Sequence, residues 1–159
     1  MPASGELTTT ARLRELGLIL PEPPRPLGAY VAAVQTGSLL VLSGMLPLVD
    51  GLPRTIGRIG ETVSIEGGRE GARLAALNAL ALAKQALGTL DRIRRVVRAT
   101  VTMTTTARFE AHATIADGAS DVFAALFDEG HTRVAVGAYT LPLGASVLLD
   151  VVFELRSED

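Results

Sequence analysis

Few side chains in this sequence stand where they could do chemistry, and Arg133 is the most informative of them. It belongs to the segment His131-Thr132-Arg133, directly before an apolar run typical of a β-strand. A guanidinium stays charged at physiological pH, and its planar set of donors matches a carboxylate. This position therefore predicts recognition of a small carboxylic acid. A solvated arginine at the first residue of a strand is the competing interpretation.

A second group of candidates brackets an expected hairpin, with Tyr30 at its start and Ser43-Gly44 at its end. The tyrosine could present its ring or hydroxyl to a pocket, and the serine could position a ligand or a water molecule. A half-buried strand tyrosine and a turn-capping serine are the ordinary alternatives. Nothing beside Ser43 in the sequence supplies the base that a nucleophilic serine needs.

Charged residues form two further groups. Asp117 and Asp121 lie four residues apart on one face of an expected helix, as part of a site or as a plain surface pair, with Gly118 between them. Basic residues gather at the start of an expected strand: Arg92, Arg94, Arg95 and Arg98. They could contact phosphates, but acidic residues outnumber basic ones by 17 to 15, so we favour a solvated strand edge.

Composition excludes several classes of protein. The 159 residues include no cysteine and no tryptophan, which excludes a disulfide scaffold, a thiolate nucleophile and an indole stacking platform. The net charge of −2 argues against a nucleic-acid partner. His112 and His131 lack the spacing of a helical metal-binding pair, and Lys84 is the only lysine, which argues against Schiff-base chemistry. We expect no metal and no cofactor.

No apolar run reaches the length of a membrane span, and the first ten residues have no apolar core, so we expect neither a membrane partner nor a signal peptide but a cytoplasmic protein. Hydrophobic residues make up 48% of the chain and charged residues 20%. A domain of this size has too little interior for so many apolar side chains. We therefore expect part of the surface to be buried against copies of the same chain.

The elements that must position the candidate residues follow from periodicity and turn signals. We expect helices over 8–16, 68–87 and 110–128, and an extended proline connector at 21–26. We expect strands over 30–34, 39–43, 93–105, 134–139 and 147–155, with a short strand at 55–59 inside a loop over 44–60. The last strand is apolar at both alternating sets of positions, so both of its faces should be covered.

This order of elements predicts an α+β domain over residues 28–159, preceded by an N-terminal helix and proline-rich connector over 1–27. In it, two helices cover one face of a mainly antiparallel sheet. The other face needs a partner, and a second subunit is the simplest one.

A family resemblance adds to this interpretation. Arg133 is followed eight and nine residues later by Leu141-Pro142, and this spacing, together with Tyr30, Ser43-Gly44 and the helix that carries Asn78, resembles the Rid family. These YjgF-type reactive intermediate deaminases were historically labelled endoribonuclease L-PSP. The resemblance covers about residues 28 to 155. It implies a chorismate-mutase-like fold, a homotrimer and ligand clefts at the subunit interfaces.

In the family, an arginine binds the carboxylate of a 2-imino or enamino acid, and a glutamate assists hydrolysis to a 2-keto acid and ammonia. The resemblance places the arginine, as the catalytic residue, at Arg133. It places substrate-binding residues at Tyr30, Ser43, Gly44 and Arg133, with Asp117 at the position of a family asparagine.

Departures from the family pattern fall at the same sites. The glutamate position holds Leu148, and the glutamine that usually follows Ser-Gly is Met45. Leucine cannot activate water, whereas Asp150 shares a strand face with Leu148 and could act from a shifted position.

Three functions stay open on the sequence. The first is a Rid-like trimer that binds small carboxylate or carbonyl metabolites and hydrolyses reactive imines. The second is a non-catalytic binding or regulatory trimer. The third is an endoribonuclease, which rests only on the historical label.

Overall fold

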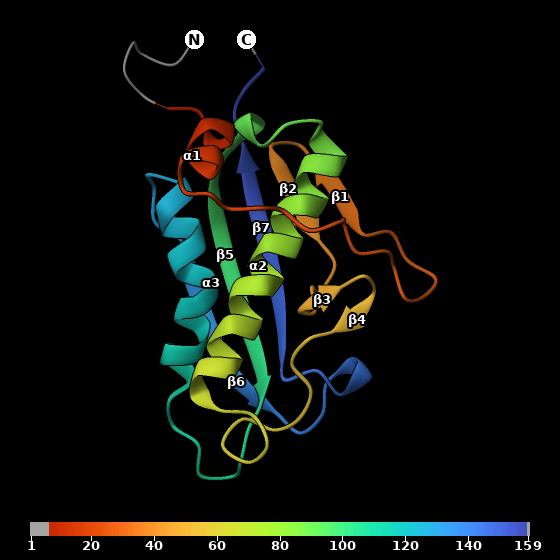
Figure 1. Ribbon diagram of the computed structural model, residues 1–159. Helices are drawn as coiled ribbons and strands as arrows, with labels where there is room; N and C mark the ends of the chain where they lie inside the picture. Colours follow the sequence, from red (N-terminus) through yellow and green to blue (C-terminus); the bar gives the residue numbers. More distant parts are fainter. Residues whose placement is uncertain (1–6, 159) are drawn as a thin grey trace.

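The computed structural model describes residues 7–158, which form one layer of sheet and one layer of helices (Figure 1). The main sheet has the strand order β1-β2-β7-β5-β6, in which β5 and β6 run parallel and the other neighbours run antiparallel. The strands are β1 Ala33–Thr36, β2 Leu39–Leu42, β5 Ile93–Thr104, β6 Thr132–Ala138 and β7 Val147–Leu155. A separate small hairpin consists of β3 Leu48–Val49 and β4 Leu52–Pro53.

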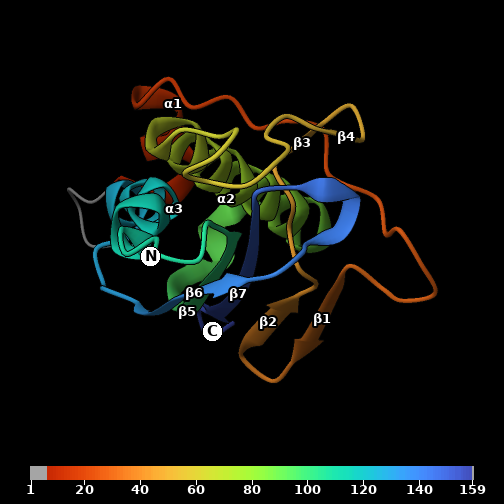
Figure 2. The same ribbon diagram turned by 90° about the horizontal axis from the view of Figure 1, so that it is seen from below.

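The helices α2 Ile65–Leu87 and α3 His112–Leu126 lie side by side on one face of this sheet, as Figure 2 shows. Ser64 caps α2 by accepting a hydrogen bond from the Gly67 amide, and Gly88 ends it with φ 83°. The alanines of α2 other than Ala86 are almost fully buried, because this helix packs against both α3 and the sheet. The mainly antiparallel α+β architecture expected from the sequence is confirmed.

Gly118 sets how closely the two helices approach. A Cβ atom at this position would lie 2.0 Å from the carbonyl oxygen of Arg69 on α2, so no larger residue fits without moving a helix. Glycine in the middle of a helix costs stability, and here close helix packing explains it. This close packing of the two helices also fixes the position of the neighbouring Asp117 relative to the sheet.

The N-terminal helix α1, Thr9–Glu15, lies at one end of the helical layer. The Thr10 amide donates to Asp91 at 2.8 Å, and Arg12 donates to both carboxylate oxygens of Asp128 at 2.7 and 2.9 Å. These contacts join α1 to the turn before β5, which contains the 3₁₀ helix Leu90–Arg92, and to the end of α3. Within residues 7–158, no helix is long and apolar enough to cross a membrane.

Most of the expected elements form, with differences at their ends. The hairpin begins at Ala33 rather than Tyr30, and a two-residue turn at Gly37-Ser38 replaces the expected four-residue one. No strand forms at 55–59, because its backbone makes only isolated bridges, such as Ile56 with Ala145. The loop instead contains the β3–β4 hairpin, which Asn78 of α2 holds by donating to the carbonyls of Leu46 and Leu48.

The two faces of the sheet differ in what covers them. Odd-numbered residues of β7, such as Leu149 and Phe153, are buried beneath the helices. Even-numbered residues point to the other face, on which the structure places no helix. Alternation and register assign these residues to the open face: Val34, Leu39, Val41, Thr100, Thr102, Val134, Val136, Leu148, Asp150 and Val152.

Candidate functional site

Arg133 lies at the free edge of the sheet and points toward the helices. In the parallel register it pairs with Ala99, which is fully buried on the helix side, and paired residues share a face. Its Nη1 donates to Asp117 Oδ1 at 2.6 Å and to Ser120 Oγ at 3.1 Å. Its Nη2 and Nε make no hydrogen bond to any residue from 7 to 158. One side of the guanidinium is thus held by α3 and the other is free.

The Ser120 hydroxyl also contacts His131, with 2.9 Å between Oγ and Nε2. The ring of His131 meets the edge of Phe123 at a centroid distance of 5.9 Å, which fixes its plane. Burial, and then the charge of Arg133, lowers the pKa of His131 below its ordinary value. Both effects favour the neutral form of the His131 ring.

Sequence reasoning assigned Arg133 and Asp117 to the site but not Ser120 or His131. The spacing of both residues in the sequence could have identified them. Ser120 follows Asp117 by one helical turn, and His131 precedes Arg133 by two residues, the spacing of neighbours on one strand face. Asp121 does not join this group. It binds Arg69 of α2 and so helps hold the two helices together.

Tyr30, Ser43 and Gly44 come together at the other end of the sheet. They line one small hollow with connector residues 24–27. The Tyr30 hydroxyl accepts a hydrogen bond from the Leu27 amide at 3.1 Å, and the Ser43 hydroxyl donates to the Val31 carbonyl at 2.8 Å. Gly44 lies against Leu148, whose Cδ1 would be 3.1 Å from an added Cβ atom. The hydroxyl groups here stabilise the local conformation of the backbone.

A single chain does not bring these two groups together. Arg133 is on the edge strand β6, whereas Ser43 and Gly44 follow β2, and β5 and β7 lie between them. The three or four strand spacings between the two groups correspond to a distance of about 15–20 Å. We name the two groups the arginine half, Asp117, Ser120, His131 and Arg133, and the hairpin half, Tyr30, Ser43 and Gly44.

Leu148 and Asp150 lie on the open face, whereas Arg133 points to the helix face. Leu148 pairs with Thr102, and Asp150 pairs with Thr100. Burial raises the pKa of Asp150, and it forms no ion pair with any described residue. Within one chain, the position of the family glutamate is therefore separated from Arg133 by the sheet itself.

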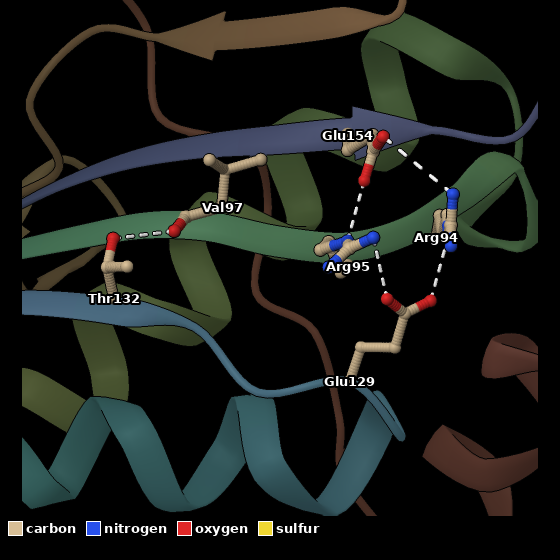
Figure 3. A network of polar contacts seen from close by, with 6 residues as sticks. All are labelled: Arg94, Arg95, Val97, Glu129, Thr132 and Glu154. Atoms are coloured by element: carbon tan, nitrogen blue, oxygen red, sulfur yellow. Dashed lines mark hydrogen bonds and ion pairs between the residues drawn. The ribbon is translucent and has the colours of Figure 1, made fainter.

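The basic cluster at the start of β5 is neutralised by carboxylates (Figure 3). Arg95 contacts Glu154 at 2.6 Å and Glu129 at 2.7 Å, and Arg94 contacts Glu129 at 2.8 Å. Hydrogen bonding to Arg94 lowers the pKa of Glu129. Arg92 reaches Glu158 in the same way at 2.9 Å. These arginines connect strands and loops. The expected solvated strand edge is not what forms, because β5 lies between β7 and β6 and the arginines are paired with carboxylates.

Possible metal ligands and cavities limit what the site could hold. Residues 7–158 contain no group of three or more His, Asp or Glu side chains placed to hold a metal ion. A cavity of about 300 Å³ lies between α2, α3 and the end of α1, and its lining residues include Leu18, Arg73 and Val122. Asp121 lines this cavity, whereas Arg133, Asp117, Tyr30, Ser43 and Gly44 do not.

Comparison with known proteins identifies the relatives of the chain. Residues 10–155 match the family model described as "YjgF/chorismate mutase-like, putative endoribonuclease". The chain belongs to the YjgF family. Among curated proteins, Protein TCP17 from Trypanosoma cruzi is 37% identical over 158 residues, with 98% of each chain covered.

Several solved structures share this fold. Atu1372 from Agrobacterium tumefaciens, a protein of unknown function, is 35% identical, with a TM-score of 0.85 and coverage of 93% of this chain and 92% of its own. A Shewanella oneidensis protein with the same endoribonuclease description is 34% identical, with a TM-score of 0.89 and coverage of 94% and 100%. TdcF from Escherichia coli, solved with bound serine, is 23% identical, with a TM-score of 0.63 and coverage of 86% and 94%, and supports the fold alone.

Proposed function

We propose that this protein is a Rid-like homotrimer whose interface clefts bind small carboxylate or carbonyl metabolites. In each cleft, Arg133 of one subunit holds the carboxylate, and Tyr30, Ser43 and Gly44 of the next subunit shape the opposite wall. The reaction that we assign to the cleft is the hydrolysis of reactive 2-imino or enamino acids to 2-keto acids and ammonia.

The half-free guanidinium of Arg133 is the observation that carries this proposal. Asp117 and Ser120 hold Nη1, so the side chain is already ordered before a ligand arrives. Nη2 and Nε together form a parallel pair of donors, which can donate two hydrogen bonds to one carboxylate. Preorganisation of this kind lowers the entropy cost of binding. Serine bound to TdcF, a ligand with a carboxylate, is consistent with this chemistry.

The separation of the two halves supports the trimer. They lie at opposite edges of one sheet, so neighbouring copies that join edge to edge would bring them together. The open face supports the same assembly. Val34, Val41 and Val136 are 50%, 38% and 43% exposed there, and an apolar sheet face of this kind is stabilised by burial.

A non-catalytic binding trimer is the second candidate, and Leu148 favours it. An apolar side chain packed against Gly44 has no proton to exchange, so binding through Arg133 could persist without turnover. The endoribonuclease description receives no comparable support, because Arg94 and Arg95 are bound to carboxylates rather than available to phosphates.

Binding of pyruvate and 2-oxobutyrate, measured by isothermal titration calorimetry, tests the role of Arg133. Arg133→Gln removes the charge and the paired donors, and we expect affinity to fall at least 30-fold, about 2 kcal/mol. Arg14→Gln removes an exposed arginine of α1 and serves as the control. Equal affinities of the three proteins would overturn the carboxylate assignment.

Mixed assemblies test whether two subunits share a cleft. Gly44→Phe blocks the hairpin half by pushing into Leu148, and Arg133→Gln disables the arginine half. Neither variant should bind ligand alone. After denaturation and refolding together in equal amounts, about one quarter of the clefts should combine two intact halves and bind again. Mixed assemblies without recovered sites would show that each chain carries its own site.

Imine hydrolysis is measured by generating the imine from an amino acid with an amino-acid oxidase and following the release of the 2-keto acid. We expect acceleration by the wild type and none by Arg133→Gln. Binding without acceleration would leave the non-catalytic trimer as the function.

A further inference from the structure

The cavity of about 300 Å³ between α2, α3 and the segment that follows α1 is separate from the site already described, because no residue of the arginine half or of the hairpin half lines it. Figure 2 shows α1 and the connector on the side of the helical layer that faces away from the sheet. The cavity is therefore on the opposite side of the molecule from the open sheet face, and the proposed trimer leaves it accessible. Its volume is at the lower end of the range for small-molecule sites, which favours a small metabolite as the occupant.

Four charged side chains line the cavity, and two of them neutralise each other. Arg69 of α2 binds Asp121 of α3, with 2.5 Å between Nη2 and Oδ2. The side chains of Glu70 and Arg73 form no ion pair or hydrogen bond with any group in residues 7–158. The cavity therefore presents one unpaired positive charge and one unpaired negative charge to a ligand.

These two unpaired charges are neighbours on α2. Glu70 and Arg73 are three residues apart in the helix, so their side chains leave it on the same side, from Cβ atoms about 5–6 Å apart. An α-amino acid carries its ammonium and its carboxylate on one carbon atom, so a single molecule can donate to Glu70 and accept from Arg73. A plain carboxylate would be repelled by Glu70, and a plain amine would be repelled by Arg73. The pair of charges therefore selects a zwitterion.

The apolar part of the lining favours a hydrocarbon side chain on this ligand. Val122 and Ala125 line the cavity from α3, and Leu16 and Leu18 line it from the segment after α1. Val122 is almost fully buried, whereas Leu16 is 50% exposed. An aliphatic group placed among these residues would cover part of the exposed surface of Leu16, and removal of apolar surface from water stabilises a complex.

We propose that this cavity binds a free α-amino acid with an aliphatic side chain, such as leucine. Arg73 holds the carboxylate, Glu70 holds the ammonium, and the side chain packs against Leu18 and Val122. This inference goes beyond the proposed function, because none of these residues takes part in the cleft around Arg133. A ligand here touches α2, α3 and the segment after α1, so it should also raise the temperature at which the protein unfolds.

Isothermal titration calorimetry with L-leucine tests the site. Leucine has a carboxylate that Arg133 could also bind, so the titrations are made in the Arg133→Gln background as well as in the wild type. Arg73→Gln and Glu70→Gln should each weaken leucine binding about tenfold or more in both backgrounds, because each removes a hydrogen bond between charged groups. Arg14→Gln and Glu66→Gln, at exposed residues outside the cavity, are the matched controls and should change the affinity less than about twofold.

Analogues of leucine test the three parts of the proposed ligand. The compound 4-methylpentanoate lacks the ammonium, 3-methylbutylamine lacks the carboxylate, and glycine lacks the side chain. Each should bind to the Arg133→Gln protein about tenfold more weakly than leucine, or worse. Ala125→Trp places an indole in the cavity from an exposed position of α3, so it should abolish leucine binding and leave the affinity for 2-oxobutyrate unchanged.

Leucine binding that is lost in Arg133→Gln but kept in Arg73→Gln would overturn this proposal, because leucine would then occupy the arginine half. Absence of leucine binding at millimolar concentration in both backgrounds would also overturn it. Absence of 2-oxobutyrate binding in the wild type would contradict the proposed function alone, so the failure of each proposal is distinguishable from that of the other.

Discussion

The arginine half and the hairpin half differ in what their polar atoms do. In the hairpin half, the hydroxyls of Tyr30 and Ser43 are both bonded to backbone groups within the same segment. In the arginine half, side chains hold one another, and Arg133 keeps two nitrogens free. Side chains that hydrogen-bond to the backbone fix the shape of the pocket wall, whereas side chains with free donors can bind a ligand. We infer that one half selects the ligand by size and the other binds its charge.

Separating the two halves should have the largest effect. Val152 lies on the open face between Val41 and Arg98, and Val152→Arg would bury an unpaired charge in the proposed interface. We expect the trimer to dissociate and the affinity for 2-oxobutyrate to fall more than 100-fold. Light scattering coupled to size exclusion measures the assembly. Leu52→Arg, at an exposed residue of β4, is the control and should leave both unchanged.

Changing the charge of the arginine half should have an intermediate effect. The side chain of Asp117 is 44% exposed, and its negative charge offsets the positive charge of Arg133. Asp117→Asn keeps the shape of the side chain and removes this charge, so carboxylate affinity should rise about fivefold, about 1 kcal/mol, and the gain should shrink in high salt. Titration calorimetry at two salt concentrations measures this. Weaker binding in the variant would mean that the charge of Asp117 mainly positions Arg133.

Removing one hydroxyl from the hairpin half should have the smallest effect. Tyr30→Phe loses the hydrogen bond from the Leu27 amide but keeps the ring, which is 50% exposed. We expect the free energy of unfolding in urea to fall by about 0.5 kcal/mol and ligand affinity to change less than twofold. A tenfold loss of affinity would show that the Tyr30 hydroxyl contacts the ligand and would contradict the division between shape and charge.

The elements with strong periodicity could be predicted from the sequence, and those set by tertiary contacts could not. The strand over 147–155 has the bounds that its continuous apolar pattern predicts. The helix that begins at Ile65 starts three residues earlier than expected, because the Ser64 cap outweighs the low helix propensity of Gly67 and Gly68. The β3–β4 hairpin depends on hydrogen bonds from Asn78, which is distant in sequence.

The same division applies to the candidate site. Arg133 and Asp117 could be proposed from residue type and resemblance, and the structure brings them within 2.6 Å. The contact of Ser120 with His131 depends on how α3 packs over β6, which Gly118 fixes through its contact with the Arg69 carbonyl. The position of the two halves at opposite sheet edges follows from strand order, which local patterns do not encode.

The close spacing of the arginine half along the chain affects how the protein is made. Asp117 and Arg133 are 16 residues apart, and Ser120 and His131 lie between them. Short loops close at low entropic cost, and local contacts form early in folding. A newly synthesised chain can therefore pair its arginine with its own aspartate before it meets another subunit, so this cation is already shielded during the interval in which an unassembled chain is most exposed to non-specific association.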